Sequence, residues 1–292
     1  MENEISPIHS DLFIKLRGET SLLPEASIIV PVNAQSDLGM VQNTLQDISK
    51  YNGPHRIEVV LVINNYPPES PPSIIDDFRS AGIKVQAVPQ LLSEKEIKNL
   101  TERLYGSKVV RSSNLTSARS FRIFKARIQG SKIASSENLI HFDADCRVPN
   151  ISPLIDWYVT NLQSGTALAY SHVDYYELPS SLATQLYLKI HHLFRWVKRT
   201  ILGIPTSRGS NYALLRTPFI ELFENNSLNA DNKVGPFFKS RGWKIVYNGK
   251  QQLAVFTSGR DFVSNWGSLS EYVIWRINYY WKRRSLGPGS RS

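Results

Sequence analysis

Cysteine is almost missing from this chain of 292 residues, in which Cys146 is the only one. A single cysteine cannot form a disulfide within the chain, which is compatible with a reducing cytoplasm. Long apolar runs are missing too, since no window approaches the roughly eighteen uninterrupted apolar residues of a membrane-spanning helix. The start, MENEISPIHS, is too polar and acidic for a secretory signal. We therefore expect a cytoplasmic protein without disulfides or membrane spans.

Acidic residues are in the minority, with 25 Asp and Glu against 34 Lys and Arg, and the net charge is +9. Such an excess favours anionic partners: phosphates, nucleic acid or a membrane surface. The basic residues are scattered and form no recognisable nucleic-acid-binding motif, so we expect no nucleic-acid partner. With 41% hydrophobic residues, the chain can bury the core of one large α/β domain or of two smaller ones.

The first hundred residues alternate between apolar runs and helical patterns. Residues 26–32 (ASIIVPV), 57–65 (IEVVLVINN) and 83–88 (IKVQAV) are typical of buried strands. Apolar residues recur at helical spacing over 38–48, and a second helix is expected over 73–81. This alternation predicts an α/β fold with a Rossmann-like, mixed and mostly parallel sheet flanked by helices.

The second half of the chain alternates less regularly. A long amphipathic helix is expected from about Ser180, followed later by a helix near Asp231 and a final strand pair at 244–248 and 253–259. The long helix carries one apolar stripe, formed by Leu182, Leu186, Ile190, Leu193, Val197 and Ile201. Its opposite face carries His192, Arg195 and Arg199.

Two aspartates, Asp143 and Asp145, follow the apolar strand at 138–142 (NLIHF). Carboxylates this close repel each other and are costly to desolvate, so another group should share their charge. They lie just past the carboxyl end of a strand, where open α/β sheets bind ligands. The pair suits Mg²⁺ or Mn²⁺, which bridge to substrate phosphates, but an aspartate here could equally cap the helix expected near Ser152.

Seven short segments resemble, in order and over roughly residues 26–260, the family 2 glycosyltransferases with the GT-A fold. SIIVPVNAQ resembles the family's opening strand, and VVLVINN resembles the strand that usually ends in two aspartates. SARS resembles the start of a helix behind the nucleotide, and HFDADCRVP resembles the metal-binding strand. GSNYALLR resembles the segment on the acceptor side. ADNKVGPFFKSRGWKIVYN resembles the helix that begins with the catalytic aspartate and the Gly-Trp strand that follows it, and TSGR resembles the segment that closes the core. The resemblance implies an inverting, metal-dependent transferase that uses a nucleotide-diphospho-sugar, either a UDP- or a GDP-sugar.

The resemblance also implies roles for residues at matching positions. Asp231 would be the catalytic base, and Asp145, with Asp143 nearby, would hold Mn²⁺ or Mg²⁺. The acceptor side would comprise Gly209, Ser210 and Asn211. The donor would be contacted by Pro31, Val32, Asn33, Asn64, Asn65, Arg119, Asp143 and Arg260.

Several of these residues have a plainer interpretation. Asp231 could be only a helix N-cap, Asn211 could satisfy backbone groups of a turn, Arg119 could be a surface arginine, and Arg260 could pair with a surface acid. A retaining transferase of the same fold and a non-catalytic relative that binds a sugar nucleotide therefore remain alternatives.

The chain departs from the family pattern at three places. Asn33-Ala34-Gln35 replaces Tyr-Asn-Glu, Asn64-Asn65 replaces two aspartates, and Ala230 replaces a glutamate. An asparagine can offer its carbonyl to uracil or guanine, but it lacks charge and can flip to donate. We therefore expect weak base discrimination, with UDP-sugars slightly favoured.

Three regions are expected: a nucleotide-sugar-binding half at 20–150, an acceptor-binding half at 151–265, and an aromatic, basic helix with a disordered tail at 266–292. Residues 271–284 (EYVIWRINYYWKRR) are too few to cross a bilayer, but their aromatic and basic residues suit a helix lying at its surface. They could also pack on the catalytic core. The first interpretation predicts peripheral contact with the inner face of a membrane and a lipid-linked or membrane-proximal acceptor.

Overall fold

The computed structural model describes residues 23–91, 95–96, 111–178, 180–224 and 231–259. These residues form two compact units, one from the described parts of 23–174 and 204–257, the other from the described parts of 175–203 and 258–259. Arg260 and the whole of 266–292 lie outside the described residues, so the three expected regions and the surface helix at 271–284 stay predictions. Within the described residues, no helix combines the length and the apolar character needed to cross a bilayer.

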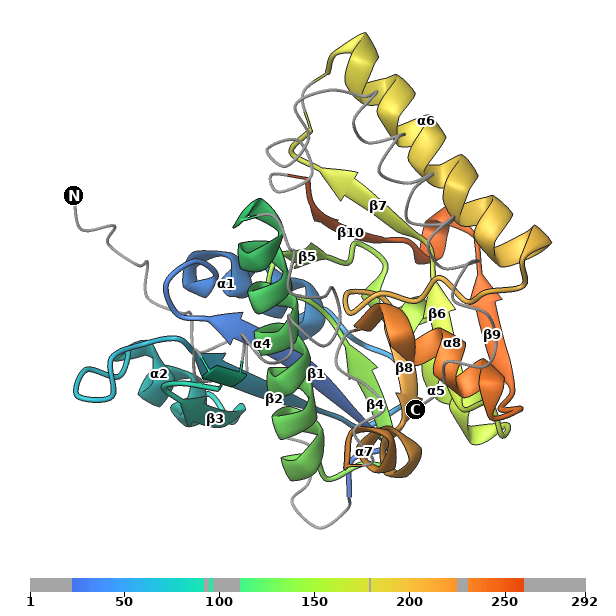
Figure 1. Ribbon diagram of the computed structural model, residues 1–292. Coiled ribbons are helices and arrows are strands. Elements are labelled where there is room, and N and C mark those ends of the chain that lie inside the picture. The colour runs from blue at the N-terminus through green and yellow to red at the C-terminus, as the bar shows by residue number, and fades with distance from the viewer. Residues whose placement is uncertain (1–22, 92–94, 97–110, 179, 225–230, 260–292) are drawn as a thin grey trace. The chain divides into compact units, whose positions relative to one another are not determined.

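A seven-stranded sheet organises the first unit (Figure 1). In spatial order its strands are β3 (Lys84–Val88), β2 (Ile57–Asn64), β1 (Ala26–Asn33), β4 (Asn138–His141), β8 (Tyr212–Leu215), β6 (Leu168–Ser171) and β9 (Ile245–Asn248). All neighbouring strands are parallel except that β8 runs antiparallel to both β4 and β6. The predicted α/β class, with a mixed and mostly parallel sheet, is confirmed.

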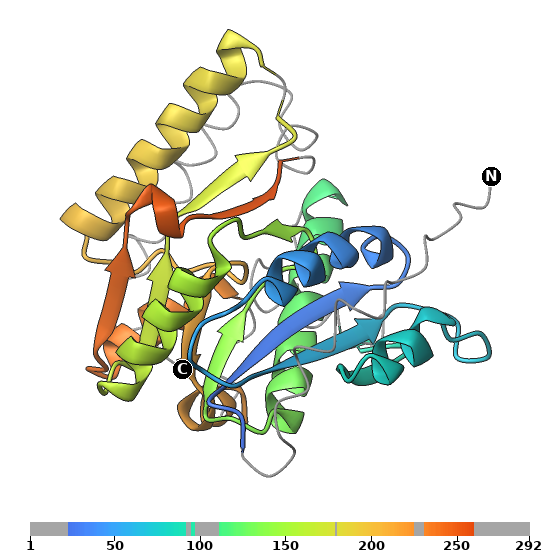
Figure 2. The same cartoon turned by 180° about the vertical axis from the view of Figure 1, so that it is seen from behind.

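Helices cover both faces of this sheet (Figure 2). One face packs against α1 (Leu38–Ser49), α2 (Ile74–Ser80) and α5 (Ile151–Gln163). The other packs against α4 (Arg111–Ile133), α7 (Arg216–Glu224) and α8 (Val234–Ser240). Ile28 and Val30 of β1 enter the first layer and Ile29 the second, as the alternation of side chains along a strand requires. Burial on both faces explains why β1 and β2 are uninterrupted apolar runs.

The carboxyl ends of β1, β2 and β3 lie level with one another. Asn33 is paired with Asn64, and Asn64 with Val88, so the last residues of the three strands share one edge of the sheet. β4 runs in the same direction beside β1, with His141 opposite Ile29. Asp143 and Asp145 therefore emerge from the same edge as Asn33 and Asn64.

A smaller sheet has the order β5-β10-β7, from β5 (Cys146–Arg147), β10 (Val255–Ser258) and β7 (Val173–Tyr176). Two short 3-10 helices, η4 (Asp231–Lys233) and η5 (Gln251–Leu253), also belong to the first unit. The two final strands expected at 244–248 and 253–259 are present as β9 and β10, but they do not pair with each other, because β9 pairs with β6 in the large sheet and β10 pairs with β5.

The second unit contains α6 (Leu182–Trp196), which continues as the π-helix η3 (Val197–Ile201). Ser181 caps α6, and its hydroxyl oxygen accepts a hydrogen bond from the Thr184 backbone N–H at 3.2 Å. Of the residues expected opposite the apolar stripe, Arg195 is buried and His192 and Arg199 are partly buried, whereas the leucines of the stripe are exposed.

Candidate functional site

The loop after β4 carries Asp143 and Asp145 and is fastened to α1. The Thr44 hydroxyl oxygen lies 2.8 Å from the Ala144 carbonyl oxygen and 2.7 Å from that of Cys146, to which it donates. About one helical turn further along α1, the Asp47 carboxylate accepts hydrogen bonds from the Val148 N–H at 2.9 Å and from Arg147 Nε at 2.8 Å. These contacts hold the loop from Ala144 to Val148 against a helix packed in the core.

Three side chains of this loop could approach a metal ion. Ligand atoms of Asp143, Asp145 and Cys146 all lie within 4.8 Å of one another. Burial raises the pKa of the Cys146 thiol, and the neighbouring Asp143 and Asp145 carboxylates raise it further, so this sulfur stays protonated. The donors suited to a cation are therefore the two carboxylates, whose hard oxygens fit Mg²⁺ or Mn²⁺. Asp145 also accepts a hydrogen bond from the Thr257 hydroxyl at 3.1 Å.

The group that shares the charge of the aspartates is Arg127 of α4. Its side chain is completely buried, and Nη2 forms an ion pair with Asp143 Oδ1. Nη1 donates to the Phe142 carbonyl oxygen at 3.3 Å, and Nε lies 3.2 Å from Asp231 Oδ1 and 3.3 Å from Oδ2. Burial by itself would lower the pKa of Arg127, but the carboxylates of Asp231 and Asp143 outweigh it and raise the pKa.

Asp231 is thus brought next to the loop of Asp143, although 88 residues separate them in the sequence. It begins η4, and its Oδ1 also accepts a hydrogen bond from the Tyr212 hydroxyl at 2.9 Å. Gly209 is required here, because a Cβ at this position would lie only 2.7 Å from both Arg127 Cζ and Asp231 Oδ2. The absence of a side chain at Gly209 is what lets the two charged groups meet beneath the turn.

Of the three expected acceptor residues, Gly209 lies at this ion pair, while Ser210 and Asn211 are buried beside it. Asn211 Oδ1 accepts from the Arg208 N–H at 2.9 Å, and its Nδ2 donates to the Ser171 carbonyl oxygen. Its own carbonyl oxygen accepts from the Tyr158 hydroxyl at 2.7 Å. Asn211 therefore shapes the turn, and a direct role of this amide with an acceptor stays a prediction.

His141, the last residue of β4, packs beside the same cluster. Its ring stacks at a tilt on Tyr212, with centroids 4.8 Å apart, and neither ring nitrogen has a hydrogen-bond partner within the described residues. Burial lowers the pKa of His141 well below its usual range, and the positive charge of Arg127 lowers it further. The imidazole is therefore neutral, and the positive charge beside Asp143 and Asp231 comes from Arg127.

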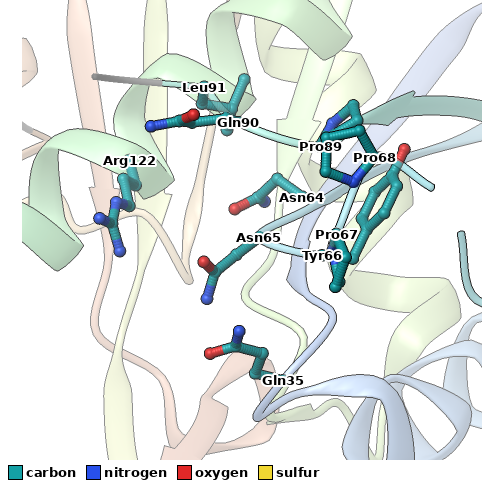
Figure 3. Close-up of a pocket in the computed structure, with 10 residues that line it drawn as sticks. All are labelled: Gln35, Asn64, Asn65, Tyr66, Pro67, Pro68, Pro89, Gln90, Leu91 and Arg122. Atoms are coloured by element: carbon teal, nitrogen blue, oxygen red, sulfur yellow. The ribbon is translucent and has the colours of Figure 1, made fainter. Parts of the chain in front are cut away.

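A pocket of about 270 Å³ opens at the carboxyl ends of β1, β2 and β3 (Figure 3). It is lined by Gln35, Asn64, Asn65, Tyr66, Pro67, Pro68, Pro89, Gln90, Leu91 and Arg122. Two of the expected donor residues, Asn64 and Asn65, border it directly. Asn33 holds the second of them, since its Oδ1 accepts from Asn65 Nδ2 at 2.9 Å. Pro31 and Val32 are buried in β1 behind this rim.

The orientation of the Asn64 amide is set by the backbone around it. Nδ2 donates to the Val32 carbonyl oxygen at 3.0 Å and lies 3.4 Å from that of Val62. A flipped amide would point its oxygen at two carbonyl oxygens, so the carbonyl of Asn64 is kept as an acceptor toward the pocket. Weak discrimination between nucleotide bases was expected because an asparagine amide can flip between accepting and donating. The contacts of Asn64 disfavour such a flip.

Arg119 lies in α4, but its side chain is outside the described residues, as is the whole of Arg260. Their expected contacts with a donor stay predictions. Sequence reasoning missed Arg127, Thr44 and Asp47, which position the site. Nothing in their local sequence distinguishes them from other polar residues of α1 and α4.

No family model matches the chain, and no curated protein matches it in sequence. Solved glycosyltransferases resemble it in fold: the mannosyltransferase PcManGT from Pyrobaculum calidifontis, in complex with GDP-Man and Mn²⁺, has a TM-score of 0.47 at 14% identity, covering 81% of this chain and 57% of that one. GalNAc-T7 with UDP, GalNAc and Mn²⁺ has a TM-score of 0.48 at 13% identity, covering 82% of this chain and 44% of that one. S. aureus TarS has a TM-score of 0.46 at 13% identity, covering 82% and 38%. The chain thus spans 38–57% of the length of these chains.

Replacing Arg127 by Leu should destabilise the first unit strongly. The change leaves Asp143 and Asp231 without their buried cation, and breaking a buried ion pair from one side typically costs about 3–5 kcal/mol. We expect urea unfolding to show a loss of this size. Lys132→Ala on the same helix is the control, because it removes an exposed pair with Glu224 and a cation–π contact with Phe223, each worth about 1 kcal/mol or less. Equal losses in the two variants would contradict the central role of Arg127.

Proposed function

We propose that this chain is a metal-dependent glycosyltransferase that moves a sugar from a UDP- or GDP-sugar to an acceptor hydroxyl with inversion at the anomeric carbon. The observation that carries the proposal is the grouping of Asp143 and Asp231 on one buried guanidinium, with Asp145 two residues from Asp143. This group lies at the same sheet edge as the pocket bordered by Asn64. A carboxylate loop, together with a pocket at the same edge that offers several amide side chains among prolines, suits a nucleotide diphosphate better than either feature alone.

The charges of these four residues support a divalent cation. Asp143, Asp145 and Asp231 supply three carboxylates, and Arg127 supplies one positive charge, which leaves the group negative. Asp145 would be the principal ligand, because Asp143 is already held by Arg127. When bound there, Mn²⁺ or Mg²⁺ would offset the negative charge that develops on the leaving diphosphate.

Asp231 would accept the proton of the acceptor hydroxyl as the oxygen attacks the anomeric carbon from the face opposite the nucleotide. Arg127 and Tyr212 would orient its carboxylate by the contacts described above. Aspartate side chains in general are weak bases. Asp231 is suited to act late, when the attacking hydroxyl has become acidic.

The same ion pair favours one alternative, a retaining transferase in which Asp231 is structural. A carboxylate that accepts from a buried guanidinium and a buried hydroxyl already has a clear role in packing. The stereochemistry of the product distinguishes the two proposals, because inversion changes the anomeric configuration and retention preserves it.

The metal site is tested by replacing Asp145 with Ala. We expect the variant to lose sugar transfer and the Mn²⁺-dependent part of donor binding while it unfolds at an unchanged temperature. Nucleotide release and calorimetric donor titrations, each with and without Mn²⁺, measure these effects. Asp76→Ala, which removes an exposed carboxylate on α2, is the matched control. Full activity of the unmodified protein in EDTA would rule out a required metal.

The base is tested by Asp231→Asn, which is nearly isosteric but cannot accept the proton. Turnover should fall by about a hundredfold or more, because general base catalysis typically contributes that much. Donor affinity should change little, since the loss is confined to the transition state. Tyr212→Phe, which keeps the carboxylate but removes one of its donors, should cost much less. Unchanged turnover of Asp231→Asn would instead favour the structural role.

Donor choice is tested at Asn64. Its fixed carbonyl can accept from uracil N3–H or guanine N1–H, whereas cytosine and adenine present an acceptor at the corresponding ring position. We expect calorimetry to show UDP and GDP binding more tightly than CDP and ADP. Asn64→Leu should weaken UDP binding by about tenfold, the worth of one neutral hydrogen bond, and remove the preference.

Gln35→Ala, at an exposed position of the same pocket, is the control for Asn64→Leu and should retain the preference. Equal affinities of the unmodified protein for all four nucleotides would show that the Asn64 carbonyl does not read the base.

A further inference from the structure

The helix α6 turns its apolar residues outward. Of the eight large hydrophobic residues that are exposed in the described chain, six belong to α6, η3 and the residue that follows. They are Leu182, Leu186, Leu193, Trp196, Ile201 and Leu202, with exposed fractions between 47% and 82%. We call these six residues the outer apolar face; Figure 1 shows the course of α6, which carries the first four of them. An exposed cluster of this kind marks a surface that is covered when the protein works.

The buried side of α6 carries polar and aromatic side chains instead. Tyr187, His191 and Arg195 follow one another at four-residue spacing, and each is at most 8% exposed. His191 Nε2 lies 3.5 Å from the Tyr175 hydroxyl. A surface helix of a globular protein normally buries its apolar stripe and exposes its polar one. The reversal in α6 excludes the interpretation of the outer apolar face as ordinary core.

The charges along this helix all have one sign. No Asp or Glu occurs between Glu177 and Glu221, a stretch that includes α6 and η3 in full. Lys189 is exposed and falls at the spacing of the stripe, three residues after Leu186 and four before Leu193. Lys198 and Arg199 follow in η3 and are partly exposed.

Charge complementarity distinguishes the possible occupants of this face. A second copy of the chain would bring a net charge of +9 against another +9, and residues 260–292, with six basic and two acidic residues, are positive as well. Anionic lipid is complementary to the lysines and apolar beneath its headgroups. A lysine can extend its ammonium to the headgroups while its stem lies along apolar surface, and tryptophan favours the same zone.

We infer that the outer apolar face of α6 binds the surface of an anionic membrane, with the helix lying in the interface. At about 1.5 Å per residue, its fifteen residues reach about 22 Å, less than the roughly 30 Å of a bilayer core, so the helix lies on the membrane instead of crossing it. The inference concerns this unit by itself and is independent of the proposed transferase activity.

The test is co-sedimentation of the full chain with vesicles of phosphatidylcholine alone or mixed with phosphatidylglycerol. We expect binding to the mixed vesicles only, and weaker binding as salt is raised. The double variant Leu186→Gln with Leu193→Gln should bind at least about tenfold more weakly, because two side chains no longer enter the apolar zone. Lys189→Glu should reduce binding to the mixed vesicles at low salt.

Trp243→Gln is the matched control, because Trp243 is 43% exposed but lies outside α6, and it should bind like the unmodified chain. Unchanged binding of the double variant would overturn the inference. The inference would also be overturned if light scattering showed that the unmodified chain is a dimer and binds no vesicles, while the double variant is a monomer. The outer apolar face would then be an interface between two copies of the chain. A large fall in the melting temperature of the double variant would show that the face packs within the chain, and would overturn the inference as well.

Discussion

A guanidinium without any exposed surface is the constraint on which the site depends. An uncompensated charge at that depth would be too costly to keep, so Arg127 must be met by carboxylates and carbonyl oxygens. Asp143 and the Phe142 carbonyl oxygen come from the end of β4, and Asp231 comes from η4. Three segments that are distant in sequence are therefore held at one point. The same contact that makes the arginine tolerable also sets the positions of two aspartates.

The rest of the site is built around that contact. Gly209 has no side chain, which leaves room for the turn before β8 to approach the ion pair, and Tyr212 adds a hydroxyl to Asp231. On the other side of the loop, Thr44 and Asp47 bind backbone groups between Ala144 and Val148. Asp145 thus belongs to a loop that is held by α1 and by the cluster of Arg127. The proposed metal site at Asp145 would need such preorganisation, because a displacement of about 1 Å in a catalytic group can slow a reaction about a hundredfold.

The sequence was sufficient to predict the apolar strands of the sheet and the position of Asp143 and Asp145 after one of them. It was insufficient to predict the residues that contact these two aspartates. The runs that became β1 and β2 are apolar without interruption, because both faces of a parallel strand are buried, and this signal is local. Asp143 and Asp145 directly follow such a run. Arg127 gives no local signal, since a buried arginine is defined by carboxylates that lie 16 and 104 residues away. The partners of the last strands are non-local too, which is why β9 and β10 were wrongly expected to pair.

The orientation of α6 is a second feature that the sequence does not predict. The spacing of Leu182, Leu186 and Leu193 correctly places them on one face, but periodicity does not state whether that face meets protein or solvent. The usual assumption, that the apolar face is the inner one, fails because Tyr187, His191 and Arg195 occupy the buried side. Only the burial of individual residues reveals the reversal. A helix of one charge sign with its leucines outward is stable in water only to the extent that its buried side anchors it. The outer apolar face contributes to stability when it is covered, and an occupant with an apolar layer and negative charge would complement both its leucines and the basic residues beside them.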